Sequence, residues 1–209
     1  MVKNLENILK KLLKKYPDVK TSLKYSNNFE LLVSVILSAQ CTDKKVNEVT
    51  EKLFKILKKP EDYASVSLEK LENYIKPTGF FRNKAKNIQK TARIILKDFN
   101  SKVPDTMEEM LKLSGVARKT ANVVLGNAYG VVEGIAVDTH VKRLSQRMGF
   151  SKSKNPDQIE KDLMKIIPRS QWFIFTYLLI EHGRTVCKSK KPGCHTCVLN
   201  ELCPSAFKV

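Results

Sequence analysis

Near the middle of the chain runs the stretch Leu113-Ser114-Gly115-Val116-Ala117-Arg118-Lys119-Thr120-Ala121, which is followed by Val137-Asp138-Thr139-His140. The first stretch predicts a tight glycine turn between two helices, with Lys119 in the first turn of the second helix. Backbone N–H groups at the start of a helix suit a phosphate. A lysine amine together with a carboxylate, here Asp138, suits covalent chemistry at an electrophilic carbon. An amine nucleophile and a phosphate-binding turn together indicate a DNA sugar as the substrate.

Apolar residues recur at the helical period along most of the chain. The periodic segments are Leu5–Tyr16, Val46–Leu57, Ala85–Phe99 and Ile159–Ile167, and the apolar runs Leu31–Leu37 and Trp172–Ile180 are short enough to be core helices. Breakers such as Lys59-Pro60 separate the segments. Asp105 with Glu108, or Thr106 with Glu109, predicts a capping box before the glycine turn. Because the sequence shows neither repeats nor the alternation typical of a sheet, it predicts an all-α protein with two helical lobes.

The charge of the chain is strongly unbalanced. Its 209 residues include 38 lysines and arginines but only 21 acidic residues, which gives a net charge of +17. Such an excess favours a polyanionic partner, and no apolar run reaches the roughly 18 residues that a membrane span needs. Nucleic acid is therefore favoured over a membrane. The alternative is a lysine-rich solvated surface of the kind found in heat-adapted proteins.

Four of the five cysteines, Cys187, Cys194, Cys197 and Cys203, lie close together in a C-x6-C-x2-C-x5-C pattern. The first residues of the chain lack the apolar region of a secretory signal, so we expect a reducing cytosol and metal ligation rather than disulfides. Only Cys194 and Cys197 have the spacing of a zinc knuckle. A cubane [4Fe–4S] cluster accepts uneven spacings more readily, which favours iron–sulfur over zinc or no metal. The fifth cysteine, Cys41, is most simply a small core residue.

The sequence as a whole resembles the endonuclease III family, whose members are bifunctional DNA glycosylase/AP lyases of the helix-hairpin-helix superfamily. The resemblance runs nearly end to end and rests on Leu37-Ser38-Ala39-Gln40, Gly79-Phe80-Phe81-Arg82-Asn83-Lys84-Ala85, the hairpin with Lys119, Val137-Asp138-Thr139-His140, His182-Gly183-Arg184 and the four cysteines. It implies excision of oxidised pyrimidines from duplex DNA and cleavage of the resulting abasic site. It also implies a six-helix barrel over residues 22–132, a helical [4Fe–4S] domain over 1–21 and 133–209, and an active site in the cleft between them.

The resemblance assigns the two catalytic roles. The Lys119 amine would attack C1′ of the damaged nucleotide, expel the base and form a Schiff base, after which β-elimination breaks the strand. Asp138 would take the proton from Lys119 or stabilise the developing sugar cation. The simpler interpretations are a surface lysine for Lys119 and an N-cap for Asp138, and capping is compatible with catalysis.

Base flipping requires residues that part the bases and fill the vacated space. Gln40 resembles the residue that fills the gap, and Phe80 the wedge on the opposite strand, although its neighbour Phe81 could take the wedge position. The structural alternatives are a polar residue at a helix end for Gln40 and a core aromatic for Phe80. His140 could lie close to the flipped base or to a phosphate. The alternative is a structural role for this histidine. Lys191 and the lysines beside it form a basic loop that the cluster would hold against DNA.

The hairpin departs from the usual family pattern in two places. The family commonly has Pro-Gly-Val-Gly where this chain has Ser114-Gly115-Val116-Ala117. Gly115 and Ala117 can both offer an N–H to a phosphate. We expect helical geometry at Ala117, so that only Gly115 must be glycine. The carbonyls of Leu111, Leu113 and Val116 resemble positions that hold a monovalent cation in such hairpins.

Three other functions fit part of the pattern. A monofunctional mismatch glycosylase of the same fold would share Asp138 and the cluster but normally lacks the hairpin lysine. The second alternative is a DNA-binding module stabilised by a metal site and without catalytic activity, which would not need Lys119 together with Asp138. The third is a redox protein, which the dense lysines around the cysteines disfavour. We expect a cytoplasmic, nucleoid-associated monomer that acts on damaged double-stranded DNA and has no membrane partner.

Overall fold

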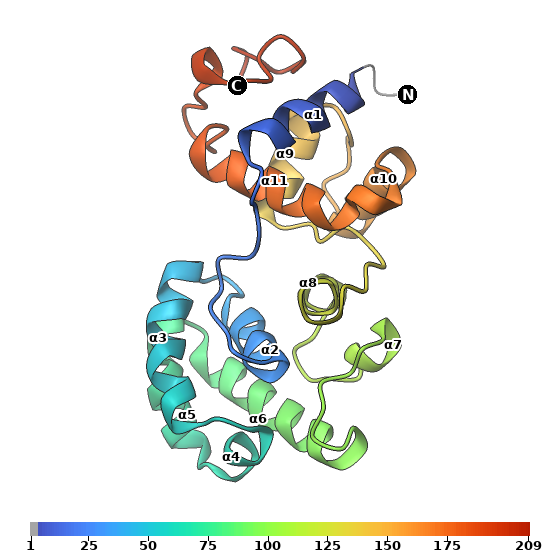
Figure 1. Ribbon diagram of the computed structural model, residues 1–209. Helices are drawn as coiled ribbons and strands as arrows, with labels where there is room; N and C mark the ends of the chain where they lie inside the picture. Colours follow the sequence, from blue (N-terminus) through green and yellow to red (C-terminus); the bar gives the residue numbers. More distant parts are fainter. Residues whose placement is uncertain (1–3) are drawn as a thin grey trace. The chain divides into compact units, whose positions relative to one another are not determined.

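The computed structural model of the protein describes residues 4–209 (Figure 1). These residues contain helices and no strand, so the all-α prediction is confirmed. Two compact units are formed, one by the residues up to Thr21 together with Val132–Val209, the other by Ser22–Val131. The predicted boundary after residue 132 differs from this division by one residue, and residues 1–3 of the predicted segment 1–21 lie outside the described part of the chain. Within residues 4–209 no helix has both the length and the apolar character needed to cross a membrane.

The unit of Ser22–Val131 is built around a mostly apolar helix that is buried on all sides. Its elements are α2 (Asn28–Leu37), α3 (Asp43–Ile56), α4 (Pro60–Ser65), α5 (Leu68–Ile75), the 3-10 turn η1 (Lys76–Thr78), α6 (Phe81–Asp98), α7 (Met107–Met110) and α8 (Arg118–Tyr129). Every residue of α2 from Phe29 to Leu37 is buried. A helix of this kind must lie inside a core, and α3, α6 and α8 pack around it (Figure 1).

The second unit joins the amino-terminal helix to helices from the end of the chain. Its elements are α1 (Leu5–Lys15), α9 (Thr139–Arg147), α10 (Pro156–Ile166), the 3-10 turn η2 (Arg169–Gln171), α11 (Trp172–Thr185) and the 3-10 turn η3 (Cys194–Thr196). In Figure 1, α1 lies beside α11, and α11 also packs on α9. The buried face of α1, with Ile8, Leu9 and Leu12, belongs to the same core as Phe175 and Leu178 of α11.

Two helix starts show how the local sequence is used. The Thr106 hydroxyl accepts from the Glu109 N–H at 3.3 Å and donates to the Glu109 carboxylate at 3.0 Å, so Thr106 caps α7. Of the two predicted pairs, the structure therefore uses Thr106 with Glu109 at the start of α7, with the Glu109 carboxylate bound to the Thr106 hydroxyl. Lys59-Pro60, expected only as a break, opens α4, because proline at the first helical position loses no hydrogen bond.

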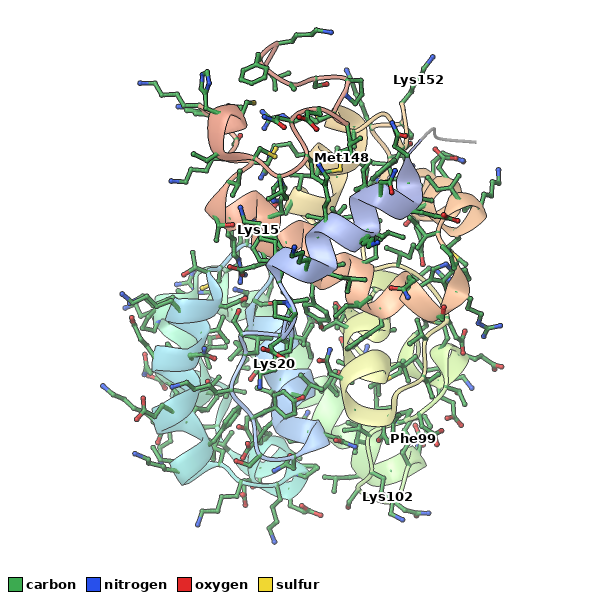
Figure 2. All side chains as sticks on the ribbon, turned by 45° about the horizontal axis from the view of Figure 1, so that its top comes forward. Lys15, Lys20, Phe99, Lys102, Met148 and Lys152 are labelled. Carbon is green, nitrogen blue, oxygen red and sulfur yellow. The ribbon has the colours of Figure 1, made fainter. Side chains whose placement is uncertain are left out.

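The excess of positive charge lies at the surface of both units. Lys102 and Lys152 extend outward from the ribbon in Figure 2. Among residues 4–209 Lys84 is the one lysine that is buried. The exposed lysines give the protein the surface expected of a polyanion-binding protein.

Candidate functional site

The glycine turn of the hairpin is held by α6. Gly115 has φ +75°, and a Cβ there would lie 2.8 Å from the amide nitrogen of the Asn87 side chain. The Ser114 hydroxyl donates to Asn87 Oδ1 at 3.0 Å, and the Thr91 hydroxyl donates to the Ser114 carbonyl at 2.8 Å. Gly115 is therefore required both for its left-handed conformation and for the close approach of Asn87.

The start of α8 differs from the expectation in one respect. Ala117 has φ −91° and ψ 170°, so it is the extended N-cap of α8 and not a helical residue. The expected helical geometry is wrong, because the chain must turn from the hairpin loop into the helix at this residue. Its negative φ still explains why alanine is tolerated. Alanine has no side-chain acceptor, so α8 begins without a side-chain cap, and Lys119 is exposed in its first turn. An uncapped helix start favours an anion, and an exposed amine beside it is accessible to a bound substrate.

The two predicted DNA-contacting turns share an unusual backbone conformation. Gln40 has φ +53° and Phe80 has φ +48°, the left-handed region that non-glycine residues seldom adopt. The Phe80 side chain is 63% exposed. The adjacent Phe81 is partly buried against the core, so one of the pair faces inward as expected. Phe80 is thus the aromatic residue that is available to contact a ligand.

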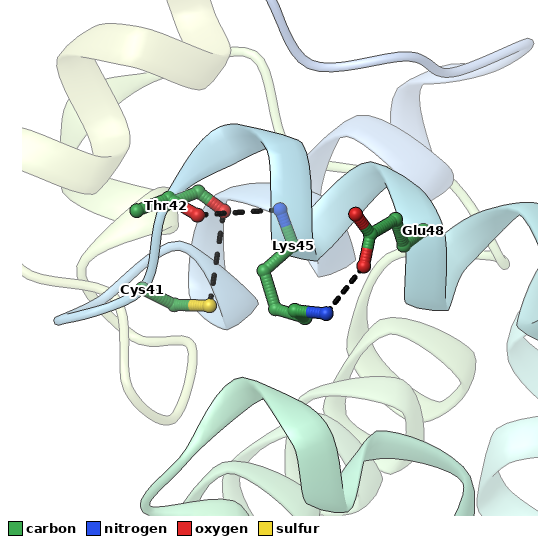
Figure 3. Close-up of polar contacts among 4 residues, drawn as sticks. All are labelled: Cys41, Thr42, Lys45 and Glu48. Atoms are coloured by element: carbon green, nitrogen blue, oxygen red, sulfur yellow. Dashed lines mark hydrogen bonds and ion pairs between the residues drawn. The ribbon is translucent and has the colours of Figure 1, made fainter.

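The chain directly after Gln40 is fixed by the first turn of α3 (Figure 3). The Thr42 hydroxyl accepts from the Lys45 N–H at 3.3 Å, and the Lys45 ammonium pairs with Glu48. The Cys41 thiol lies 3.8 Å from the Thr42 carbonyl and is partly buried against the core. Cys41 belongs to a different unit from the other four cysteines, as a small structural residue would.

Asp138 and His140 begin α9 in the second unit. Asp138 Oδ1 accepts from the Val141 N–H at 2.8 Å, so the predicted N-cap is confirmed, and Oδ2 takes no part in this cap. His140 Nδ1 lies 3.2 Å from Arg143 Nη2, and a Cβ on Gly183 would meet the same nitrogen at 2.6 Å. Burial lowers the pKa of His140, and the negative charge of Asp138 opposes this shift by raising the pKa. These contacts give His140 a packing role at the junction of α9 and α11.

Cys187, Cys194, Cys197 and Cys203 line one hollow in the second unit, together with Arg147 and His182. Its volume is about 410 Å³ when its opening to solvent is counted. Within residues 4–209 no three His, Cys, Asp or Glu side chains are grouped closely enough to hold a single metal ion. The four thiols line the same hollow, and thiolates are ligands both for zinc and for iron–sulfur clusters.

Nitrogen donors surround these sulfur atoms. Arg147 Nη1 donates to Cys187 Sγ at 3.3 Å, the Leu199 N–H donates to Cys197 Sγ at 3.4 Å, and His182 Nε2 lies 3.4 Å from Cys197 Sγ. Burial, with a smaller contribution from a nearby lysine, lowers the pKa of His182 to about 4. Burial also raises the pKa of the Cys197 and Cys203 thiols. A bound metal group would be needed to keep them deprotonated, and the surrounding donors suit thiolate ligands.

The basic loop after Cys187 is anchored by arginines of α9. Arg147 donates to the Lys188 carbonyl at 2.8 Å and to the Ser189 carbonyl at 3.0 Å, and Arg143 donates to the Cys187 carbonyl at 2.9 Å. Lys191 is exposed in the same loop. The sequence alone does not reveal the roles of Arg143 and Arg147, because in so basic a chain no local pattern separates an anchoring arginine from a solvated one.

We predict that Gly115→Ala destabilises the protein more than Gly130→Ala. Both glycines have positive φ, but a Cβ at Gly130 has open space around it, whereas a Cβ at Gly115 meets Asn87. Gly130→Ala should cost about 1–2 kcal/mol of unfolding free energy from backbone strain alone, and Gly115→Ala should cost more. Urea denaturation of the two variants measures the difference. Equal losses would show that Asn87 moves aside and that the close approach is not required.

A family model, related sequences and solved structures all indicate the same protein family for this chain. The family model described as HhH-GPD superfamily base excision DNA repair protein matches residues 33–169. The chain is 53% identical to endonuclease III of Synechocystis sp. over 199 residues, which cover 95% of this chain and 90% of that protein. It is 45% identical to the protein in a solved non-covalent endonuclease III–DNA complex, with a TM-score of 0.94 over 99% of this chain and 96% of the other. A trapped endonuclease III–DNA covalent intermediate matches with the same identity and TM-score over 99% and 97%. The chain therefore belongs to the endonuclease III family, within the HhH-GPD superfamily of base excision DNA repair proteins.

Proposed function

We propose that Lys119 is the nucleophile with which this DNA glycosylase and AP lyase removes oxidised pyrimidines from duplex DNA. The observation that carries the proposal is the exposed amine of Lys119 in the first turn of a helix that starts without a side-chain cap. Such a position can bind the phosphate of the nucleotide that the amine attacks. The covalent endonuclease III–DNA intermediate of a relative supports attack by a protein group in this family.

The reaction requires a deprotonated amine and proceeds through several bond-breaking steps. The Lys119 nitrogen forms a bond to C1′, and the N-glycosidic bond breaks with its electron pair leaving on the base, which takes up a proton. Opening of the sugar ring gives an imine between Lys119 and C1′. The imine makes the C2′ proton acidic, so its removal expels the 3′ phosphate by β-elimination, and water then releases the lysine. No external oxidant or reductant is needed.

Asp138 is the proposed partner of this chemistry. Its carboxylate caps α9 through Oδ1, which fixes the side chain in one orientation. Oδ2 takes no part in this cap and would accept a proton from Lys119 or stabilise positive charge on the sugar. Capping therefore contributes to catalysis by holding the carboxylate rigid.

The remaining DNA contacts come from exposed turns. Gln40 would fill the space that the flipped nucleotide leaves, and Phe80 would part the bases of the opposite strand. The N–H groups of Gly115 and Ala117 would bind phosphate, and Lys191 would contact the backbone from its basic loop. The carbonyls of Leu111, Leu113 and Val116 in the hairpin would hold a monovalent cation. His140 would support α9 by the packing described above.

The four cysteines Cys187, Cys194, Cys197 and Cys203 would hold a [4Fe–4S] cluster. When bound, the cluster would supply four iron–thiolate bonds that cross-link the carboxyl-terminal segment. The N–H donors of Arg147 and Leu199 to two of the sulfurs suit this ligation. The unit of Ser22–Val131 would thus be the helix-hairpin-helix domain, and the other unit the cluster domain.

Borohydride reduction of a Schiff base tests the nucleophile. Wild-type protein should become covalently linked to duplex DNA with an abasic site, and peptide mapping should place the link on Lys119. Lys119→Gln should abolish the adduct, because an amide cannot form the imine. Lys112→Gln, which removes another exposed lysine of the same hairpin, should still form it. If the wild type binds damaged duplex but never forms the adduct, the lyase mechanism fails and a non-catalytic or monofunctional role takes its place.

Iron analysis of cysteine variants tests the cluster. We expect about four iron atoms and as many sulfides per chain in anaerobically purified protein. Cys194→Ser should lose most of this iron, whereas Cys41→Ser should retain it, since Cys41 lies in the other unit. One zinc ion per chain with negligible iron and sulfide would overturn the assignment.

Salt dependence tests the contribution of Lys191. The affinity for undamaged duplex should fall with a log–log slope steeper than about −2, since each neutralised phosphate contributes roughly −0.9. Lys191→Ala should make the slope shallower by about one phosphate and should weaken binding to damaged and undamaged duplex alike. Lys102→Ala, which removes an exposed lysine of the other unit, serves as the control. An unchanged slope for Lys191→Ala would remove this residue from the DNA interface.

A further inference from the structure

The first turn of α6 contains a lysine that the reaction does not use. Lys84 is 5% exposed, and its Nζ donates to the Leu37 carbonyl and to the Thr78 carbonyl, both at 2.8 Å. Leu37 is the last residue of α2, and Thr78 is the last residue of η1. One ammonium group therefore joins the ends of two elements that are far apart in the sequence.

A buried ammonium is costly unless its donors are satisfied. Burial lowers the pKa of Lys84, which shows that the surroundings disfavour its charge. The two carbonyls offset this penalty, since the last carbonyls of a helix lack partners within it and lie at its negative end. A leucine or methionine would fill the same volume without the penalty. The position therefore requires the two hydrogen bonds and not only the volume.

Each of the two carbonyls lies at the base of a turn with a proposed DNA contact. Three residues beyond Leu37 the chain reaches Gln40, and two residues beyond Thr78 it reaches Phe80. Both have positive φ, and such strain persists only where the surroundings determine the conformation. The Lys84 N–H also donates to the Phe80 carbonyl at 3.1 Å. Both the main chain and the side chain of Lys84 thus restrain these turns.

The same face of α6 also holds the hairpin. Asn87 and Thr91 follow Lys84 by three and seven residues, a spacing that places all three on one side of a helix. Asn87 and Thr91 bind the Ser114 side chain and carbonyl, as described above. One polar face of α6 therefore holds all three turns with proposed DNA contacts in this unit.

We propose that Lys84 is a positioning residue that fixes the Gln40 turn and the Phe80 turn relative to each other, so that both can enter the duplex at once. This inference rests on the proposed function, which assigns base-stack contacts to Gln40 and Phe80. Lys84 acts through these residues and does not contact DNA itself. Its loss should therefore impair the opening of a paired duplex more than the chemistry at Lys119.

The test compares two substrates of Lys84→Met, which keeps the volume but removes the ammonium. Single-turnover excision of thymine glycol paired with adenine should fall by about tenfold or more, because small displacements of positioning groups cost this much. Cleavage of a preformed abasic site, which needs less unstacking, should fall far less. Lys86→Met removes the same charge from an exposed position on the same helix and should leave both rates within about twofold of wild type.

A second measurement reports the opened duplex without catalysis. A 2-aminopurine base opposite the lesion should become fluorescent when wild-type protein binds, and this signal should be weaker with Lys84→Met at saturating protein. Lys84→Arg, which keeps a cation and several donors, should recover part of the signal. Adding Gln40→Ala to Lys84→Met should cost less than in the wild-type background, because the two residues act together.

The outcomes separate this inference from the proposed function. If Gln40→Ala and Phe80→Ala excise paired lesions normally, the proposed roles of the two turns fail. If those variants are impaired and Lys84→Met is not, only the role of Lys84 fails. Equal loss of both activities by Lys84→Met, in proportion to lost folding, would show that Lys84 is a core residue without a positioning role. Should Lys84→Met not fold, Lys84→Gln, whose shorter side chain cannot bridge both carbonyls, takes its place with the same expected difference between substrates.

Discussion

The burial of α2 is the constraint on which the unit of Ser22–Val131 depends. A mostly apolar helix whose residues are buried on every side is stable only inside a core, and α3, α6 and α8 surround it. This packing determines where the ends of these helices lie. The chain leaves α2 towards Gln40, Phe80 directly precedes α6, and the hairpin leads into α8, which contains Lys119. The positions of these exposed turns are consequences of one buried helix, which gives the proposed DNA contacts a rigid support.

In the second unit the corresponding element is α11, against which α1 and α9 pack. The carboxylate of Asp138 is held by the start of α9, and the arginines further along the same helix bind the carbonyls of the loop after Cys187. One helix thus supports both the loop beside the proposed cluster ligands and a proposed catalytic residue. The sulfur atoms also receive hydrogen bonds from the protein, which is how a protein supports thiolate ligands.

The two units use different means to hold functional groups in place. The second unit uses a helix cap at Asp138 and arginine–carbonyl hydrogen bonds from α9. The first unit contains left-handed residues and restrains them from one face of α6. Gly115 tolerates positive φ without cost, but Gln40 and Phe80 do not. Side chains that intercalate or fill a gap cannot be replaced by glycine, so their turns need external support. The hydrogen bonds of Lys84 provide it.

The sequence by itself determined the features that depend on neighbours a few residues away. Helical periods predicted the all-α fold, the glycine turn placed Lys119 at a helix start, and Asp138 was predicted as a cap. Only the tertiary structure decided the extended conformation of Ala117, the approach of Asn87 to Gly115 and the burial of Lys84. The physical reason is that periodicity and capping are set within one or two helical turns. The contacts of Lys84 and Asn87 instead join segments that come together only when α2 is buried. Among 38 basic residues no local pattern distinguishes Lys84, the one lysine that is buried within residues 4–209.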